Sequence, residues 1–507
     1  MFHYSKYILP LLLLIGCKNK QQEKTATEYN EPHRLQVHFS PKEKWMNDPN
    51  GLVYYDHLYH LFYQYYPDST VWGPMHWGHA TSSDLLHWTH QPIALYPDSL
   101  GYIFSGSVVV DVNNTSGFGK YGKPALVAIF TQHDPKGEKA GTLNFQNQSI
   151  AYSIDEGKTW IKYSGNPVLK NPGIKDFRDP KVRWHEESKK WIMTLATQDR
   201  ISFYSSPNLK NWTRESDFGK DVGAHGGVWE CPDLFPMMVN NEKLWVLLVS
   251  INPGGPNGGS ATQYFIGSFN GHRFIPFQTD TRWIDYGPDD YAGVTWSNTG
   301  ERKIFLGWMS NWLYGTKVPT EKWRSAMTVP RDLSLEKIGD KYFLRSIPVP
   351  ELHQLEEDPV EKKNIDASAL ELGTPTGNSS DATRLDISST QLVDFNITLS
   401  NPSGEKLVVG YNADSNRYFI DRRKSGLVDF EKDFAAIHSA PRLSASKEFI
   451  LTVIIDHSSV EVFADNGLTV MTEIFFPHQD YDHIAFQSKQ HFPIGSFHLA
   501  RLKSIWK

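Results

Sequence analysis

The stretch WMNDPNGLVYYDHLYHLFYQYYP, residues 45–67, contains both the patterning and the chemistry that decide the fold. A turn-forming run encloses one acid, Asp48, between an asparagine and a proline. The aromatic and β-branched runs LVYY and LYHLFYQY follow directly and predict β-strands. The carboxylate therefore stands where a turn opens into strands, a position from which its side chain can point into a cavity.

The same texture continues from about Leu35 to Ile347. Short apolar runs such as ALVAIF, WIMTLA and KLWVLLVS are broken by Gly, Pro, Asn and Asp, which is typical of an all-β fold. Long amphipathic helical windows are hard to find, and this disfavours architectures that alternate strands with helices.

A degenerate repeat runs through this region. SSDLLHW ends at Trp88, SIDEGKTW at Trp160 and SSPNLKNW at Trp212, with spacings of 72 and 52 residues. Each unit is a serine, a turn and a tryptophan that enters the next strand. Such spacing suits the blades of a β-propeller with insertions, and three ordinary hairpins are the alternative.

The pattern changes near residue 350. A charged segment, ELHQLEEDPVEKKN, is followed by the turn-rich LGTPTGNSSD and then by alternating strands around Asp465-Asn466-Gly467, a strong hairpin signal. We therefore expect a propeller-like domain over residues 35–350 and a linker with an antiparallel β-sandwich over 351–507.

The first 17 residues, MFHYSKYILPLLLLIGC, combine Lys6, an apolar run and a small residue before Cys17, as in a signal peptide. The ending LIGC resembles a bacterial lipobox, so we expect residues 1–16 to be removed, Cys17 to carry lipid and residues 17–34 to form a polar tether. An ordinary secretory signal is the alternative. The prediction is an exported lipoprotein facing the periplasm or the cell surface, whose only membrane contact is its lipid anchor.

Composition excludes several classes of function. The formal charge of −6 gives no basic field for nucleic acid, and the 16 tryptophans and 13% aromatic content favour sugars weakly. Pairs of histidines at 76 and 79 and at 87 and 90 lack a third ligand for a metal, and GGPNGGS at 254–260 lacks the lysine of a phosphate loop. We expect no metal and no cofactor, and the oligomeric state stays open.

Three acids share one sequence setting: Asn47-Asp48-Pro49, Arg178-Asp179-Pro180 and Glu230-Cys231-Pro232. A proline disfavours helical backbone in the residue before it, so each acid should lie at a strand end or a turn. A single Asp-Pro is usually only a turn. The three acids, 131 and 51 residues apart, can meet only if separate blades bring them to one central funnel.

If the acids meet, two of them can cleave a glycosidic bond, one as nucleophile and one as proton donor. Asp48 beside the Asn47 amide should stay ionised, as a nucleophile must. Glu230, between Trp229 and Cys231, should have its pKa raised by apolar and like-charged neighbours. Asp179 and Arg178 are expected to face substrate hydroxyls. Cys231 either tunes Glu230 or is a small packing residue.

The motifs WMNDPNG, FRDPKV and WECPDL, in this order and at these spacings, resemble those of glycoside hydrolase family 32, the fructan hydrolases and invertases. FSGSVVVD, LGWMSNW and DHSSVEVFADNG extend the resemblance over nearly the whole mature chain, closest to bacterial levanases and exo-acting fructanases. It implies a five-bladed β-propeller followed by a C-terminal antiparallel β-sandwich, retaining hydrolysis through a fructosyl-enzyme, and no metal.

Carried onto this sequence, the resemblance makes Asp48 the nucleophile, Glu230 the acid/base and Asp179 the transition-state stabiliser. It also implies a fructose pocket formed by Trp45, Asn47, Gln64, Trp72, Phe104, Ser105, Arg178 and one tryptophan of LGWMSNW, where Trp308 is preferred to Trp312. The expected activity is release of fructose from levan or inulin. Endo-acting levanase and fructosyltransferase are alternatives on the same site, and a non-catalytic fructan-binding protein is a remote one.

Overall fold

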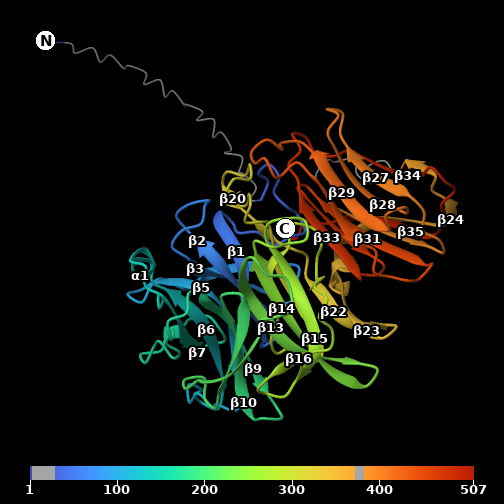
Figure 1. The fold of residues 1–507 in the computed structure, drawn as a ribbon. Helices are drawn as coiled ribbons and strands as arrows, with labels where there is room; N and C mark the ends of the chain where they lie inside the picture. The colour runs from blue at the N-terminus through green and yellow to red at the C-terminus, as the bar shows by residue number, and fades with distance from the viewer. Residues whose placement is uncertain (3–28, 372–381, 507) are drawn as a thin grey trace.

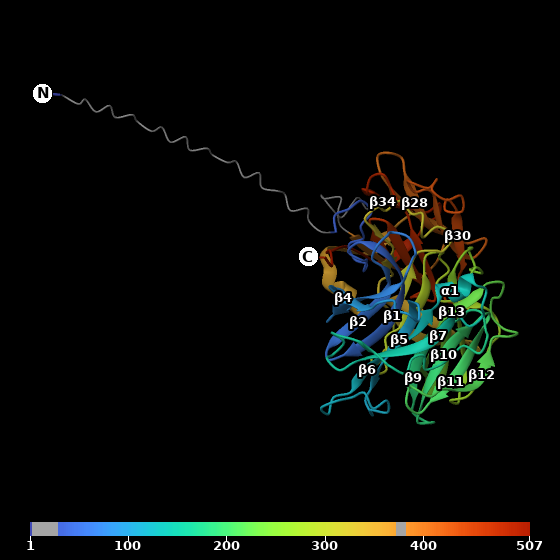
Figure 2. The ribbon, with the colours of Figure 1, turned by 90° about the vertical axis from the view of Figure 1, so that its left-hand side faces the viewer.

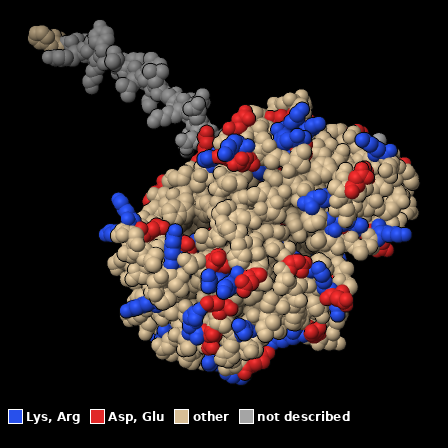
Figure 3. All heavy atoms as spheres, viewed as in Figure 1, with Lys and Arg blue, Asp and Glu red and all other residues tan. Residues whose placement is uncertain are grey.

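The structure, a computed structural model, describes residues 1–2, 29–371 and 382–506 and is almost entirely β-sheet (Figure 1). Within these residues the helices are one short α-helix, α1 (Pro135–Lys139), and one 3-10 helix, η1 (Pro350–Leu355). None of the described helices is long and apolar enough to span a bilayer. Basic and acidic side chains are interspersed on the face shown in Figure 3.

The N-terminal part is a β-propeller, and its five sheets confirm the expected blades. One strand of each sheet, β1, β5, β9, β13 or β18, contacts its counterparts in a closed ring around the axis, and the other strands extend outward (Figure 2). The first blade consists of β20 (Trp323–Arg324), β1 (Lys44–Tyr55), β2 (Leu58–Tyr66), β3 (His76–Ser82) and β4 (Thr89–Leu95), and the second of β5 (Tyr102–Asp111), β6 (Ala125–His133), β7 (Gln146–Ser153) and β8 (Ile161–Lys162). The third blade consists of β9 (Phe177–His185), β10 (Lys190–Thr197), β11 (Arg200–Ser206) and β12 (Thr213–Phe218), and the fourth of β13 (Val228–Val239), β14 (Glu242–Asn252), β15 (Ala261–Phe269), β16 (Phe274–Pro276) and β17 (Arg282–Trp283). The fifth blade consists of β18 (Tyr291–Thr295), β19 (Ile304–Met309), β21 (Ala326–Met327), β22 (Arg331–Ile338) and β23 (Lys341–Pro348).

The serine-to-tryptophan repeat forms the same hairpin, between the third and fourth strands, in the first three blades. In each copy the tryptophan Nε1 donates to a backbone carbonyl three residues earlier, at 3.1 Å for Trp88, 3.2 Å for Trp160 and 3.1 Å for Trp212. The serine hydroxyl of each copy also bonds the side chain two residues later. The repeat is therefore radial, and the alternative of three unrelated hairpins is wrong.

The ring is closed by a short strand from the last blade region. β20 lies between β19 and β22 in the sequence, yet it pairs in parallel with the start of β1 at Lys44 and Trp45. Met327 also donates its backbone N–H to Phe39 at 2.8 Å. These bonds join the last part of the propeller to the first blade. The sheet that carries Asp48 therefore contains a strand from the end of the propeller as well as strands from its beginning.

The C-terminal part is a β-sandwich of two six-stranded sheets, as expected. Apolar side chains from the inner faces, such as Leu385, Val453 and Phe395, form its core. The DNG signal forms the hairpin between β32 and β33, where Asp465, Asn466 and Gly467 have positive φ. The sheets are β24 (Glu356–Asp366), β35 (Pro493–Leu502), β26 (Ala382–Ser389), β31 (Phe449–Asp456), β32 (Ser459–Ala464) and β33 (Thr469–Ile474), and β25 (Ala369–Glu371), β34 (His483–Gln487), β27 (Phe395–Ser400), β28 (Lys406–Asn412), β29 (Arg417–Lys424) and β30 (Ile437–Pro441).

Buried charges join the propeller to the sandwich. Arg331, fully buried on β22, pairs with Asp285 at 2.9 Å and Asp290 at 3.0 Å in the propeller and with Glu461 on β32 of the sandwich. Arg422 on β29 reaches back to Asp289 at 2.8 Å. Breaking a buried ion pair leaves an uncompensated charge, so these contacts hold the two parts in one arrangement.

The segment before β1 is packed rather than extended. Tyr29 stacks on Trp506 with ring centroids 3.9 Å apart, and Arg34 is buried in an ion pair with Glu31 at 2.9 Å. Residues 29–34 therefore belong to the folded body, and we correct the expected tether to end before Tyr29. The signal peptide, Cys17 and the rest of the tether lie outside the described residues, apart from residues 1–2.

Candidate active site

Each of the five innermost strands is interrupted by a bulge or register shift near its start. A bulge places an extra residue on one strand and redirects its side chain. The candidate acids lie at these interruptions, with Asp179 at φ 64° and Cys231 at φ 45°. The shifts span Met46/Pro49 in β1, Ile103/Gly106 in β5, Arg178/Lys181 in β9 opposite Thr194/Ala196, Glu230/Asp233 in β13 and Tyr291/Val294 in β18.

The structure brings the three predicted acids together. The Cys231 backbone N–H donates to Asp179 Oδ2 at 3.1 Å, and its Sγ lies 3.7 Å from the same oxygen and 3.5 Å from Asp48 Oδ2. Arg178 connects the remaining acid, since its Nη2 donates to Glu230 Oε1 at 2.7 Å. Acids from β1, β9 and β13 thus converge at one end of the axis.

Two strong donors hold Asp48 in addition to the weaker Cys231 thiol. Asn47 Nδ2 donates to Oδ1 at 2.9 Å and Ser105 Oγ donates to Oδ2 at 2.7 Å. Both bonds favour the ionised form, but burial and the charge of Glu230 outweigh them and raise the pKa of Asp48 above its ordinary value of 3.8. The expected donors are present, and the carboxyl group is nevertheless harder to ionise than we predicted.

Glu230 lies among donors, so the expected apolar environment is wrong. Arg178 donates to Oε1 from Nε at 3.1 Å and from Nη2 at 2.7 Å, and the Tyr291 hydroxyl donates to Oε2. Neighbouring residues of a strand point to opposite faces, and Trp229 therefore packs into the core around β13 and β14 instead. A carboxyl group held on both oxygens has a fixed orientation, which suits directional proton transfer.

Asp179 has a strongly raised pKa. Burial, together with the charges of Glu230 and Asp48, outweighs the opposing Arg178 guanidinium and raises its pKa to about 7. Arg178 Nε lies 3.9 Å from Asp179 Oδ2, whereas Nη2 lies 2.7 Å from Glu230 Oε1 and Nη1 lies 2.6 Å from Asp176 Oδ1. Asp179 therefore shares the Arg178 guanidinium with two other carboxyl groups that lie closer to it.

The expected sugar-pocket residues gather around Asp48 with different exposures. Trp45 Nε1 donates to Asn47 Oδ1 at 2.7 Å and orients that amide, and Gln64 Nε2 is buried without a hydrogen-bond partner among the described residues. Trp72, 40% exposed, meets the partly buried Phe104 edge-on at 6.0 Å. An exposed aromatic face and an unpaired buried amide are groups that a sugar can contact.

The two tryptophans of LGWMSNW lie close together, with ring centroids 4.9 Å apart, but only one has an open face. Trp308 is fully buried, with no exposed surface, while Trp312 is partly exposed. Trp45 lies 5.9 Å from Trp312 and 6.1 Å from Trp308. The preference for Trp308 as the sugar-contacting tryptophan is therefore corrected in favour of Trp312.

Sequence reasoning missed Tyr291 and Asp176. Tyr291 bonds Glu230 from the bulge of β18, where no proline marks the position, and Asp176 orients Arg178 from two residues before it. Asp176 directly precedes the FRDPKV motif, so the sequence could have indicated a role for it in the site. Nothing in the sequence marks Tyr291. In the described part of the chain, no group of three or more His, Cys, Asp or Glu side chains could hold a metal ion.

Comparisons with known proteins agree with this architecture. The N-terminal domain model of the glycosyl hydrolases family 32 matches residues 38–346, and the C-terminal model of that family matches residues 351–503. A levanase of Bacillus subtilis (strain 168) is 45% identical over 495 residues, which cover 95% of this chain and 72% of the levanase. An extracellular exo-inulinase of Aspergillus niger is 40% identical over 496 residues, which cover 90% of this chain and 92% of the exo-inulinase.

Solved structures extend the match to three dimensions. The exo-inulinase of Aspergillus awamori superposes with a TM-score of 0.85 at 37% identity and covers 94% of this chain and 100% of its own. The β-fructofuranosidase of Schwanniomyces occidentalis complexed with fructosyl-erythritol gives a TM-score of 0.83 at 34% identity, covering 94% of this chain and 98% of its own.

Proposed function

Because this chain belongs to the glycosyl hydrolases of family 32, we propose that it hydrolyses β-fructofuranosyl linkages in fructans such as levan or inulin and releases fructose from chain ends. Relatives named levanase and exo-inulinase, which match 90% or more of this chain, support the substrate class. The single observation that carries the proposal is the meeting of Asp48, Asp179 and Glu230 around Cys231 and Arg178.

In the first step, a carboxylate oxygen of Asp48 forms a bond to the anomeric carbon of the terminal fructose while the bond to the leaving oxygen breaks. Glu230 donates its proton to that oxygen, so the leaving sugar departs as an alcohol. Glu230, now a carboxylate, then takes a proton from water, whose oxygen attacks the same carbon and frees Asp48. The two displacements retain the β configuration.

Asp179 and the pocket act on the sugar itself. The Asp179 carboxylate accepts hydrogen bonds from fructose hydroxyls as positive charge develops on the ring, which lowers the barrier electrostatically. Asn47, Gln64, Ser105 and Arg178 supply polar contacts, and Trp72, Phe104 and Trp312 supply apolar faces. Trp45 is as fully buried as Trp308 and acts through the Asn47 amide that it orients. The Tyr291 and Arg178 contacts keep Glu230 aimed at the leaving oxygen.

A product time course on levan, inulin and sucrose tests the activity. We expect fructose as the sole early product from levan and inulin, and fructose with an equal amount of glucose from sucrose. Asp48→Asn and Glu230→Gln should each lower kcat by at least about 10³-fold. The exposed Glu186→Gln is the matched control and should keep the wild-type rate. A ladder of oligosaccharides would refute exo action, and near-normal turnover in Asp48→Asn would refute its role.

The stereochemical outcome separates double from single displacement. In buffer containing methanol, a fructosyl-enzyme is intercepted to give methyl β-fructofuranoside, which nuclear magnetic resonance distinguishes from the α anomer. Retention also requires Asp48 and Glu230 carboxyl groups about 5–5.5 Å apart in a ligand-bound crystal structure. Release of the α anomer would overturn the nucleophile assignment.

We propose further that the enzyme is exported and held at the membrane through lipid on Cys17. The signal-like residues 1–16 and the lipobox-like LIGC support this, and a relative named extracellular exo-inulinase supports export alone. Metabolic labelling with a palmitate analogue should mark the wild-type protein and leave Cys17→Ser unlabelled. Equal labelling of both would place the lipid elsewhere.

A further inference from the structure

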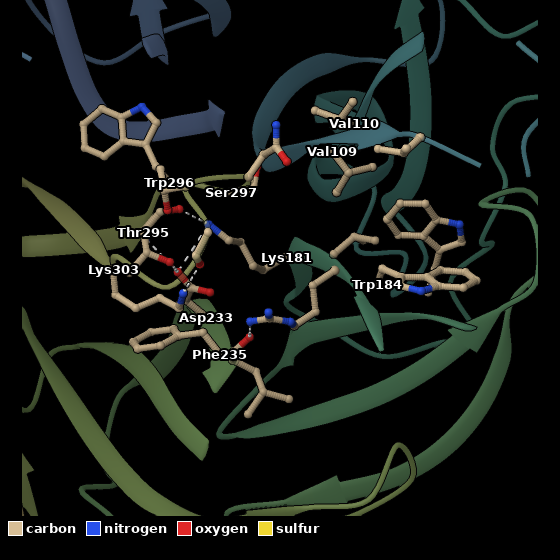
Figure 4. Close-up of a pocket in the computed structure, with 18 of the residues that line it drawn as sticks. Val109, Val110, Lys181, Trp184, Asp233, Phe235, Thr295, Trp296, Ser297 and Lys303 are labelled. Atoms are coloured by element: carbon tan, nitrogen blue, oxygen red, sulfur yellow. Dashed lines mark hydrogen bonds and ion pairs between the residues drawn. The ribbon is translucent and has the colours of Figure 1, made fainter. Parts of the chain in front are cut away.

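A second cavity lies further along the innermost strands, past the acids. Its lining includes Lys181, two residues after Asp179 on β9, Asp233, three residues after Glu230 on β13, and Thr295, four residues after Tyr291 on β18 (Figure 4). Because a strand advances about 3.3 Å per residue, this cavity lies further along the propeller axis than the acids. Its volume is about 340 Å³, and exposed residues such as Val112 and Gly300 line its mouth.

The charges around this cavity do not balance. Three cations line it, Lys181, Arg183 and Lys303, against one carboxylate, Asp233. That carboxylate already accepts bonds at 2.7 Å from both the backbone N–H and the hydroxyl of Thr295, and it lies 3.2 Å from Lys181 Nζ. With one negative charge against three positive charges, the lining carries a net charge of about +2 if all four groups are ionised.

The other two cations have only uncharged partners. Lys303 Nζ donates to the carbonyl oxygens of Gly300 at 2.7 Å and Glu301 at 3.2 Å. Arg183 donates to the carbonyl of Leu234 at 3.0 Å, and its buried Nε has no hydrogen-bond partner. Among the described residues, no carboxylate lies within 4.0 Å of a nitrogen of either cation. A buried cation with no carboxylate in direct contact is destabilising, and an anion in the cavity would relieve that.

The pKa shifts of the three cations agree with this imbalance. Burial is the main cause that lowers the pKa of Lys303 to about 8 and that of Arg183 to about 10. The charge of Asp233, with that of Glu301 for Lys303 and of Glu187 for Arg183, offsets burial only in part. The pKa of Lys181 is also lowered by burial. Each group would regain its proton affinity beside a bound anion.

We propose that this cavity binds a small multivalent oxyanion, a phosphate or a polycarboxylate, held by Lys181, Arg183 and Lys303. The guanidinium offers a planar pair of donors that matches such oxygens, and the ammonium groups add point charge. The three acids of the active site, Asp48, Asp179 and Glu230, repel the same anion. The active site therefore binds neutral sugar, and this cavity binds the anion. The proposal does not depend on the substrate of the enzyme.

Isothermal titration calorimetry of the full chain with inorganic phosphate, and separately with citrate, tests it at constant ionic strength set by sodium chloride. We expect saturable binding of about one anion per chain for at least one of the two. Because a charge-assisted hydrogen bond contributes about 1.5–3 kcal/mol, Lys303→Gln and Arg183→Gln should each weaken binding by about 10-fold or more. Binding of phosphate alone or of citrate alone identifies the class of ligand.

Two controls keep the result interpretable. Lys170→Gln removes the same charge from the exposed surface and should bind as the wild type does. Circular dichroism and the melting temperature show whether each variant is folded. If only one of Lys303→Gln and Arg183→Gln folds, that variant alone is sufficient to test the proposal. Absence of saturable heat with both anions, or equal affinity in the wild type and in a folded cavity variant, would overturn the proposal.

Discussion

Ser105 is the residue that most directly controls whether Asp48 can act as a nucleophile. Its hydroxyl donates to Asp48 Oδ2 at 2.7 Å and opposes the burial that raises the pKa of that carboxyl group. A nucleophile must be ionised, so activity should be lost as pH falls through this raised pKa. We expect the acid limb of the kcat/KM profile above pH 3.8, the ordinary value for Asp.

Ser105→Ala should move that acid limb to still higher pH. If this hydrogen bond favours the ionised over the protonated carboxyl group by about 1 kcal/mol, its loss corresponds to a shift of about 0.5–1 pH unit. Ser107→Ala is the matched control on the same strand, because its hydroxyl donates to the Pro180 carbonyl and accepts from the Val182 N–H instead of contacting a carboxylate. An acid limb that stays in place in Ser105→Ala, or moves equally in Ser107→Ala, contradicts this role.

At the residue scale, the sequence predicted the acids but not their environments. Prolines mark the backbone around Asp48, Asp179 and Glu230, so these residues could be singled out. Their pKa values depend on side chains from other blades. Arg178 crosses from β9 to Glu230, and Tyr291 reaches the same carboxylate from β18. Contacts between residues 52 and 61 positions apart are not visible in local patterning.

At the element scale, the site is built from five bulged strands. Aromatic and β-branched runs predicted the strands, because such residues pack well on a pleated surface. The bulges could not be predicted from the same runs, since a register shift is defined by the partner strand. β20 was also missed: two residues, Trp323 and Arg324, form it, and its pairing with β1 depends on closure of the whole ring.

Gly106 tests how far the site depends on a bulge. A Cβ at this position of β5 would lie 2.1 Å from the Ile129 carbonyl oxygen and 2.6 Å from the Phe130 Cα, both in the β6 backbone. Gly106→Ala must therefore push β5 from β6 and move the adjacent Ser105. We expect a loss of stability of about 1–3 kcal/mol and a lower kcat, measured by urea unfolding and by steady-state rates.

Gly495→Ala is the control for this substitution. Gly495 lies in β35, and a Cβ there would meet only Ser388 atoms at 3.7 Å or more, which is ordinary contact. Its stability and kcat should match those of the wild type. Wild-type kcat in Gly106→Ala would show that the bulge of β5 does not position Ser105.

At the scale of the whole molecule, buried charges far apart in the sequence join the two domains. His38, before the first strand, lies 2.8 Å from Asp456 through Nδ1 and 2.8 Å from Glu461 through Nε2, and Glu461 also pairs with Arg331. The change of texture near residue 350 predicted that two domains exist. It carried no information on these partners, because each buried charge lies in an otherwise ordinary strand or loop.

His38 gives this interface a specific dependence on pH. Its two carboxylate partners outweigh burial and raise its pKa from 6.5 to about 9. A raised pKa contributes stability that is fully present below pH 6.5 and is lost as pH rises through about 9. Asp456 and Glu461 have lowered pKa values, so their contribution is present above their ordinary values of 3.8 and 4.5 and is lost in acid.

His38→Gln should therefore destabilise the protein most between about pH 4.5 and 6.5. A shift of about 2.5 units corresponds to about 3 kcal/mol, and the difference from the wild type should shrink as pH rises toward 10. Urea unfolding at a series of pH values measures this difference. His353→Gln, which removes an exposed histidine paired with Glu356 at 2.7 Å, should show little effect at any pH. A difference for His38→Gln that stays constant from pH 6 to 10 would mean that the folded protein holds no extra proton at His38, and the interface would then depend on packing and hydrogen bonding rather than on charge.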